Sequence, residues 1–314
     1  MINKQQKQTA QAIVNIFETD SVLGNYSTVT VLEGDSGHLT FGRSQTTLGS
    51  GNLFILIERY CQTAGARYSQ HLQKYLAPLE NRDIRLDDDS YLHNLLRATA
   101  DDPIMLKVQD EFFEEVYWQL ALRRANNQNI TTALGIAIVY DSTIHGSWDY
   151  MRHRTNREQG DIEGLGEENW LKAYIDTRLD WLANHRKWIL RQTIYRMHTF
   201  IDMIAESFWD LPLPMVIRDH EISEHSLNAS PKGSYTGPQA GSRSLMLSSP
   251  LLRGLDVREM QLALSAKGYD LKADGWFGRG TERHLIQCQT DLGQTNNGQL
   301  NADNVIAFIQ SLTI

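Results

Sequence analysis

The stretch FETDSVLGNYSTVTVLEGDSGHLTFG, residues 17–42, decides how this chain folds. A helical pattern over residues 5–18 leads into it, and its alternating, β-branched runs predict a short hairpin over residues 26–42. Glu18 stands at the end of the helix, and Asp35 stands in the turn of the hairpin, where glycines flank it. Two carboxylates on different elements can face each other across a cleft.

This arrangement suits hydrolysis of a glycosidic bond, in which one carboxylic acid protonates the leaving oxygen and a second carboxylate activates water. Glu18 follows Ile16 and Phe17, and burial beside them would keep it protonated as the acid. Asp35 lies in a polar turn, where it ionises easily and suits a base. Glu33 is the rival base, and a surface carboxylate with a turn-forming aspartate is the alternative reading of the pair.

The spacing within this stretch resembles a known family. Glu18, followed by the run DSGHLTFG from Asp35 to Gly42, resembles the acid helix and the D-G-x-G-x-T-x-G turn of family 46 glycoside hydrolases, the chitosanases of the lysozyme-like superfamily. The resemblance implies that Glu18 is the general acid and Asp35 the general base, and that the Thr40 hydroxyl positions the water. It also implies a mainly α (α+β) fold, a two-lobed helical domain with a small β-hairpin at the cleft.

A second match lies at IVYDSTIHG, residues 138–146, which resembles the buried helix of the same family that begins V-Y-D-S and ends H-G. There the aspartate pairs with arginines, which implies a supporting network of Asp141 with Arg178 and with either Arg191 or Arg196. The residues themselves favour this pairing. The run 131–145 is almost wholly apolar, and an ionised aspartate buried in it needs a cationic partner.

Composition restricts the partners. The 314 residues carry a formal net charge of -8 and contain no basic tract, which argues against nucleic acid and anionic membranes. No metal-ligand spacing occurs, so we expect neither a metal nor another cofactor. Cys61 and Cys288 are expected to be free thiols. Nothing in the sequence indicates a symmetric apolar interface, so we expect a monomer. Without an apolar signal segment or a membrane-length run, we expect the protein to be made in the cytoplasm.

The C-terminal part has its own pattern. Residues 223–250 are rich in Ser, Gly and Pro and predict a linker between domains at 1–222 and 251–314. The pieces V-x-x-M-Q-x-x-L, G-Y, D-G-W-F-G and T-x-x-x-L-x-x-x-Q resemble the peptidoglycan-binding domain type 1, a three-helix module. Tyr269 and Trp276 are its candidate contacts to the wall.

A glycosidase joined to a wall-binding module predicts a peptidoglycan glycan-strand hydrolase, a lysozyme or muramidase that cuts β-1,4 bonds with inversion. The alternatives are a chitosanase, which the acidic surface favours, and a non-catalytic wall-binding protein. A wall hydrolase without a signal peptide must reach the periplasm or wall of its target with a holin, as an endolysin, or through a secretion system, as an antibacterial effector. An immunity protein or a secretion-system carrier is then a candidate partner.

Overall fold

The computed structural model describes residues 2–43 and 45–313. Helices hold 57% of the residues and strands 5%, which confirms the mainly α fold with a small hairpin sheet. The chain divides into two compact units that do not follow its linear order. Among the described residues, no helix combines the length and the apolar character that a membrane span requires.

The first unit runs to Gly24 and resumes at Phe113–Ala229. In chain order its elements are α1 (Lys4–Thr19), the π-helical turn η2 (Glu114–Trp118), α7 (Gln119–Asn126), α8 (Ala133–Ile144), α9 (Trp148–Gln159), α10 (Ile162–Leu165), α11 (Glu167–Ala183), α12 (Trp188–Arg191), α13 (Tyr195–Ala205), β4 (Met215–Ile217), β5 (His220–Ile222) and α14 (Glu224–Leu227).

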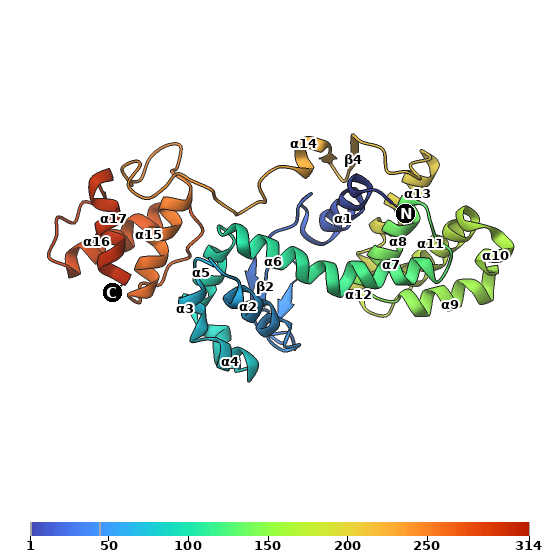
Figure 1. Ribbon diagram of the computed structural model, residues 1–314, viewed down its shortest axis with the longest axis horizontal. Coiled ribbons are helices and arrows are strands. Elements are labelled where there is room, and N and C mark those ends of the chain that lie inside the picture. The colour runs from blue at the N-terminus through green and yellow to red at the C-terminus, as the bar shows by residue number, and fades with distance from the viewer. Residues whose placement is uncertain (1, 44, 314) are drawn as a thin grey trace. The chain divides into compact units, whose positions relative to one another are not determined.

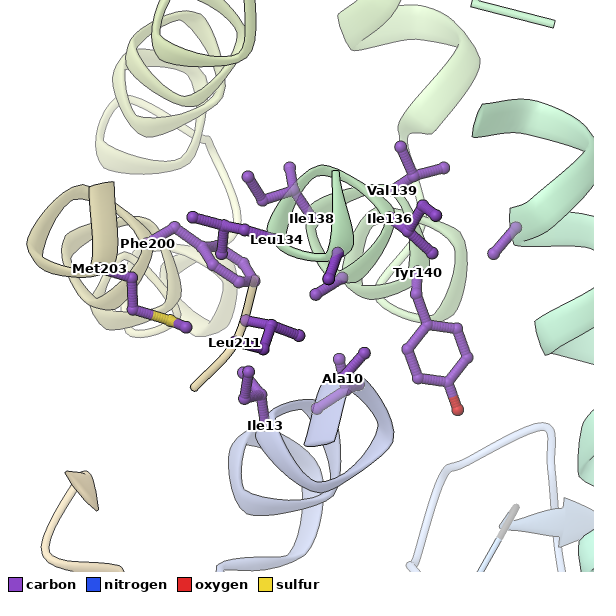
Figure 2. Packing of buried hydrophobic residues seen from close by; sticks show 14 of the residues in the cluster. Ala10, Ile13, Leu134, Ile136, Ile138, Val139, Tyr140, Phe200, Met203 and Leu211 are labelled. Atoms are coloured by element: carbon purple, nitrogen blue, oxygen red, sulfur yellow. The ribbon is translucent and has the colours of Figure 1, made fainter. Parts of the chain in front are cut away.

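Helix α8 is the centre of this unit. The Thr132 side chain caps it by accepting from the backbone N–H of Gly135, and ten of its residues are buried. In Figure 2, Ala10 and Ile13 of α1 point toward α8 from one side, and Phe200 of α13 lies on another. A helix that is apolar all round must be enclosed by its neighbours. The central buried helix expected from residues 131–145 is therefore confirmed.

The second unit comprises Asn25–Phe112 and the chain from Ser230 onward. Its elements are β1 (Val29–Thr30), β2 (Thr40–Phe41), β3 (Thr46–Thr47), α2 (Asn52–Gln62), α3 (Ser69–Gln73), α4 (Leu76–Glu80), the 3-10 turn η1 (Ile84–Asp88), α5 (Ser90–Thr99), α6 (Pro103–Phe113), α15 (Leu255–Ala266), α16 (Arg279–Asp291) and α17 (Ala302–Thr313).

The predicted hairpin forms, and a third strand extends it. Strands β1 and β2 pair antiparallel with Val29 opposite Phe41, and β2 pairs with β3 with Thr40 opposite Thr47. Each strand is only two residues long. Gly42 follows β2 with a φ of +77°, and a Cβ there would lie 2.4 Å from Oε1 of the buried Gln109. That close approach requires glycine at this position.

Helices α15, α16 and α17 form the predicted C-terminal module, with a core of their own around Met260, Phe277 and Leu285. Helix α15 packs beside α5 (Figure 1). The segment 223–250 is not uniformly exposed, because it contains α14 and the fully buried Leu245, whose backbone pairs with Leu300. The boundaries at 222 and 250 stay a prediction.

Candidate active site

Glu18 lies in the last turn of α1, and the structure fixes this helix end firmly. Asp20 is the C-cap in a left-handed conformation, and its N–H donates to the carbonyl of Ile16. The hydroxyl of Tyr195 donates to the carbonyl of Phe17 over 2.8 Å, and Nη2 of Arg196 lies 3.4 Å from the same oxygen. Helix α13 thereby satisfies a carbonyl that the helix end leaves free.

The expected burial of Glu18 is wrong, because the residue is exposed. The buried residues 12–17 surround the helix on all sides, but Glu18 stands in its last turn, and Thr19 and Asp20 after it are no longer buried. Its Oε1 lies 2.9 Å from Nη1 of Arg196. The apolar residues before Glu18 thus anchor the helix without enclosing its last carboxylate.

Behind Glu18 lies a fully buried carboxylate, Asp141 of α8. Its Oδ2 accepts from Nη1 of Arg178 over 2.7 Å, and its Oδ1 accepts from Nη1 of Arg196 over 2.8 Å. Arg191, the other candidate partner, instead donates to the backbone carbonyl of His185. The structure therefore brings Glu18, Asp141, Arg178 and Arg196 together.

The charges in this network balance the cost of burial. Burial alone would raise the pKa of Asp141, but Arg178 and Arg196 outweigh it and hold that pKa below its usual value. Burial would also lower the pKa of Arg196, yet Asp141 and Glu18 together raise it. Asp141 stays an anion and Arg196 a cation across the physiological range.

His145 at the end of α8 completes the network. Nη2 of Arg178 donates to its Nδ1 over 3.0 Å, so this nitrogen carries no proton. Burial, reinforced by Arg196 and Arg178 and opposed by Asp141, lowers the pKa of His145 to about 4. The imidazole is therefore neutral at pH 7 and acts as a hydrogen-bonded support.

Asp35 and Thr40 belong to the second unit. Asp35 is exposed in the turn before β2, and its Oδ1 accepts from the backbone N–H of Gly37 over 3.1 Å. Thr40 is the first residue of β2, is almost completely buried, and donates its hydroxyl to the carbonyl of His38. Since a hydroxyl keeps its lone pairs after donating, the Thr40 oxygen can still accept a hydrogen bond from water.

The sequence reasoning missed the anchor of this turn. Asp87, the first of three adjacent aspartates in the sequence, accepts from His38 Nδ1 over 2.8 Å and from the Leu39 N–H over 2.7 Å. Asp89 does cap helix α5 through the N–H of Leu92. A contact across 49 residues leaves no local signal, so only the fold reveals it.

The two candidate wall contacts lie in different surroundings. The Tyr269 hydroxyl bonds the Asp291 carboxylate over 2.7 Å. Trp276 is 40% exposed, and the guanidinium of Arg253 lies 5.2 Å from its ring centroid. Of the two side chains, Trp276 presents the larger open aromatic surface for a sugar ring.

Comparison with known proteins identifies the fold. The family model of glycosyl hydrolase family 46 matches residues 12–215, more than half of the chain. The chain belongs to glycosyl hydrolase family 46. A second family model, of a peptidoglycan binding domain, matches residues 253–304. Both resemblances drawn from the sequence are confirmed, and the protein is a glycoside hydrolase with a C-terminal peptidoglycan-binding domain.

The similar proteins are chitosanases. The chitosanase of Bacillus subtilis (strain 168) is 30% identical over 239 residues, which cover 70% of this chain and 84% of that protein. The native chitosanase of Bacillus subtilis MY002 matches at 27% identity with a TM-score of 0.59, over 69% of this chain and 96% of that one. The Gynuella sunshinyii family 46 chitosanase, solved in complex with chitotetraose, shares the fold with a TM-score of 0.60 at 23% identity. The match covers 71% of this chain and 98% of that one.

For this family 46 enzyme we predict that Arg196→Ala lowers the free energy of unfolding by about 3–5 kcal/mol, because it leaves the buried Asp141 carboxylate with one partner fewer. Arg191→Ala is the matched control, since it removes one hydrogen bond at the surface and is expected to cost at most about 1 kcal/mol. Urea unfolding of both variants measures the difference. Equal losses would show that the buried network does not support this unit.

We also predict a pH dependence that arises from His145. The unfolded chain takes up this proton near pH 6.5 and the folded chain only near pH 4, so the unfolded state binds more protons between these values. Stability therefore falls as the pH is lowered from about 6.5 to 4, by at most about 3 kcal/mol. His145→Gln keeps an acceptor for Arg178 but does not titrate, so its urea-unfolding profile is expected to be flatter. An unchanged slope would contradict the assignment.

Proposed function

We propose that this family 46 enzyme hydrolyses β-1,4 glycosidic bonds in the glycan strand of peptidoglycan, as a lysozyme-type hydrolase. The match of residues 253–304 to a peptidoglycan binding domain carries the choice of substrate, and the attachment of this domain supports it. Arg258 of α15 is buried and lies 3.2 Å from the equally buried carboxylate of Asp101, which follows α5. The domain is therefore packed onto the unit that carries Asp35.

The attachment has further polar contacts. Nδ2 of Asn94 in α5 donates to the Ser265 hydroxyl and to the carbonyl of Leu271, and its Oδ1 accepts from the N–H of Ala273. The N–H of Tyr235 donates to Asp101 over 2.7 Å. Because several buried polar groups find hydrogen-bond partners in this arrangement, they favour one packing of the domain against α5. A wall polymer bound to the domain would be held at the unit that carries the base, which raises the local substrate concentration.

The proposed reaction is a single displacement. Glu18 gives its proton to the glycosidic oxygen as the bond from that oxygen to the anomeric carbon breaks. Water forms the new bond to the anomeric carbon from the opposite face and loses a proton to Asp35, so the configuration inverts. Thr40 accepts a hydrogen bond from this water and orients it. Arg196, which contacts Glu18, and Asp141 behind it hold the acid in place.

Chitosan is the second candidate substrate, and the comparisons favour it. The similar proteins are named chitosanases, and one of the similar solved structures holds chitotetraose. Chitosan and the wall glycan share the β-1,4 linkage, so the same acid and base would serve both. The matched chitosanase structures cover about 70% of this chain, and the peptidoglycan-binding match at residues 253–304 is the feature that favours the wall.

The test is digestion of purified peptidoglycan and of chitosan by the wild type, Glu18→Gln, Asp35→Asn and Glu33→Gln, with mass spectrometry of the products. We expect muropeptides with new reducing ends from the wild type. Loss of the acid or the base is expected to slow the reaction by roughly 10²–10⁴-fold. Glu33→Gln is the matched control in the same turn and is expected to leave the rate unchanged.

Chitosan oligomers beside intact peptidoglycan would overturn the proposed substrate and establish the second candidate. A glycan lyase would release products without a new reducing end, and it would tolerate Asp35→Asn because it activates no water. If the wild type binds purified peptidoglycan but cleaves neither polymer, the protein would be a binding protein instead.

A further inference from the structure

The second unit contains a pocket of about 880 Å³ at which four separate chain segments meet. The segment before and within β1, residues 25–30, forms one wall, and residues 230–237 form another. The peptidoglycan-binding domain closes it with Trp276 and neighbouring side chains, and Arg97 reaches it from α5. Its volume is within the range of small-molecule binding sites.

The charge of this pocket is opposite to that of the whole chain. Its lining contains Arg97, Lys232, Arg253, Arg258 and Lys272, and the only carboxylate among the described lining residues is Asp274. Arg258 is already paired with Asp101, so four further cations face one carboxylate. On a protein with a net charge of -8, such a concentration of positive charge favours an anionic ligand.

Arg97 is the most constrained of these cations. Its Nη1 donates to Oδ1 of Asn94, which is a neutral acceptor. Burial lowers the pKa of Arg97, and the charge of Arg258 lowers it further, against the effect of Asp274. A partly desolvated guanidinium beside a second one gains from an incoming anion, which supplies the opposite charge that the site lacks.

Trp276 adds an aromatic surface at the same place. Its backbone is fixed, because its N–H donates to Asp274 and its carbonyl accepts from Nε2 of Gln261. The backbone of Arg253 pairs with it in an antiparallel bridge, and the Arg253 guanidinium lies against its ring. A rigid, open indole beside cations suits a sugar ring that carries an acidic substituent.

We propose that this pocket binds a carboxylate-bearing saccharide of the muropeptide class, with its sugar ring on Trp276 and its carboxylate at Arg97, Arg253 and Lys272. This inference rests on the proposed peptidoglycan function and names the part of the polymer that the enzyme holds away from the reacting bond. A polymer of glucosamine carries ammonium groups instead of carboxylates. The same cations would repel it.

The test measures binding without hydrolysis. In the full chain carrying Glu18→Gln, titration calorimetry with soluble disaccharide-peptide muropeptides compares the parent with the double variant Arg253→Glu, Lys272→Glu. Both side chains are exposed, so the fold is expected to tolerate the changes. We expect the dissociation constant to rise at least tenfold. Arg279→Glu combined with Arg283→Glu, an equal charge change at two exposed positions of α16 outside the pocket, is the matched control and should leave it unchanged.

A second arm uses muropeptides whose carboxylates have been converted to amides, which we expect to bind the parent as weakly as the intact ligand binds the double variant. Unchanged binding by the double variant would overturn the proposal. Binding of the amidated ligand or of a glucosamine oligomer as tight as that of the intact muropeptide would also overturn it. The two proposals fail separately. If the enzyme digests the wall but muropeptide binding does not depend on the pocket charges, only the proposal about the pocket fails. If it digests chitosan alone but muropeptide binding does depend on these charges, only the proposed substrate fails.

Discussion

The contacts of the Arg196 guanidinium fix the end of α1, which carries the candidate acid Glu18. One buried guanidinium contacts the carboxylate of Asp141 at 2.8 Å, that of Glu18 at 2.9 Å and the carbonyl of Phe17 at 3.4 Å. It thereby ties α8 and the end of α1 to α13. A lysine could not reproduce this, because its single ammonium lacks the planar array of donors that meets several acceptors at once.

The turn that carries the candidate base, Asp35, is held by a local hydrogen bond and by one carboxylate from a distant segment. Asp35 shapes its own turn through Gly37, and Asp87 holds His38 and Leu39 on the strand side of it. The peptidoglycan-binding domain packs onto the same compact unit through Asp101 and Arg258. The proposed base and the wall-binding domain therefore belong to one body, and a glycan anchored by the domain is anchored relative to Asp35.

Much of this arrangement could be predicted from the sequence, because it depends on local patterns. The apolar run of α8 predicted a central helix, and its lone Asp141 demanded a cation, which the structure supplies twice. The choice between Arg191 and Arg196 could not be made, because the two lie five residues apart in one stretch of the sequence, and only the packing of α13 decides which one points inward. The exposure of Glu18 was missed for a related reason. Apolar residues before a helix end do not show whether the last side chain of the helix is enclosed.

The rest depends on contacts between distant segments. The partners of Asp87 lie across 48 and 49 residues, and Asp101 and Arg258 are 157 residues apart, so neither pair leaves a local pattern. The pocket at Trp276 likewise forms only where four segments meet. Residues 223–250 have the composition of a linker, yet Leu245 fits the core of the C-terminal module. The composition of residues 223–250 is an average over the segment, so it does not show that a single side chain, Leu245, packs into a core.

The most direct test of the account is the configuration of the first product formed. Proton NMR of the anomeric signals, recorded during cleavage of a soluble β-1,4 oligosaccharide substrate, distinguishes the two stereochemical courses before mutarotation mixes them. A single displacement with Glu18 as acid and Asp35 as base predicts that the α-anomer appears first. A β-anomer that appears first would show retention through a covalent intermediate, and it would contradict the role assigned to Asp35.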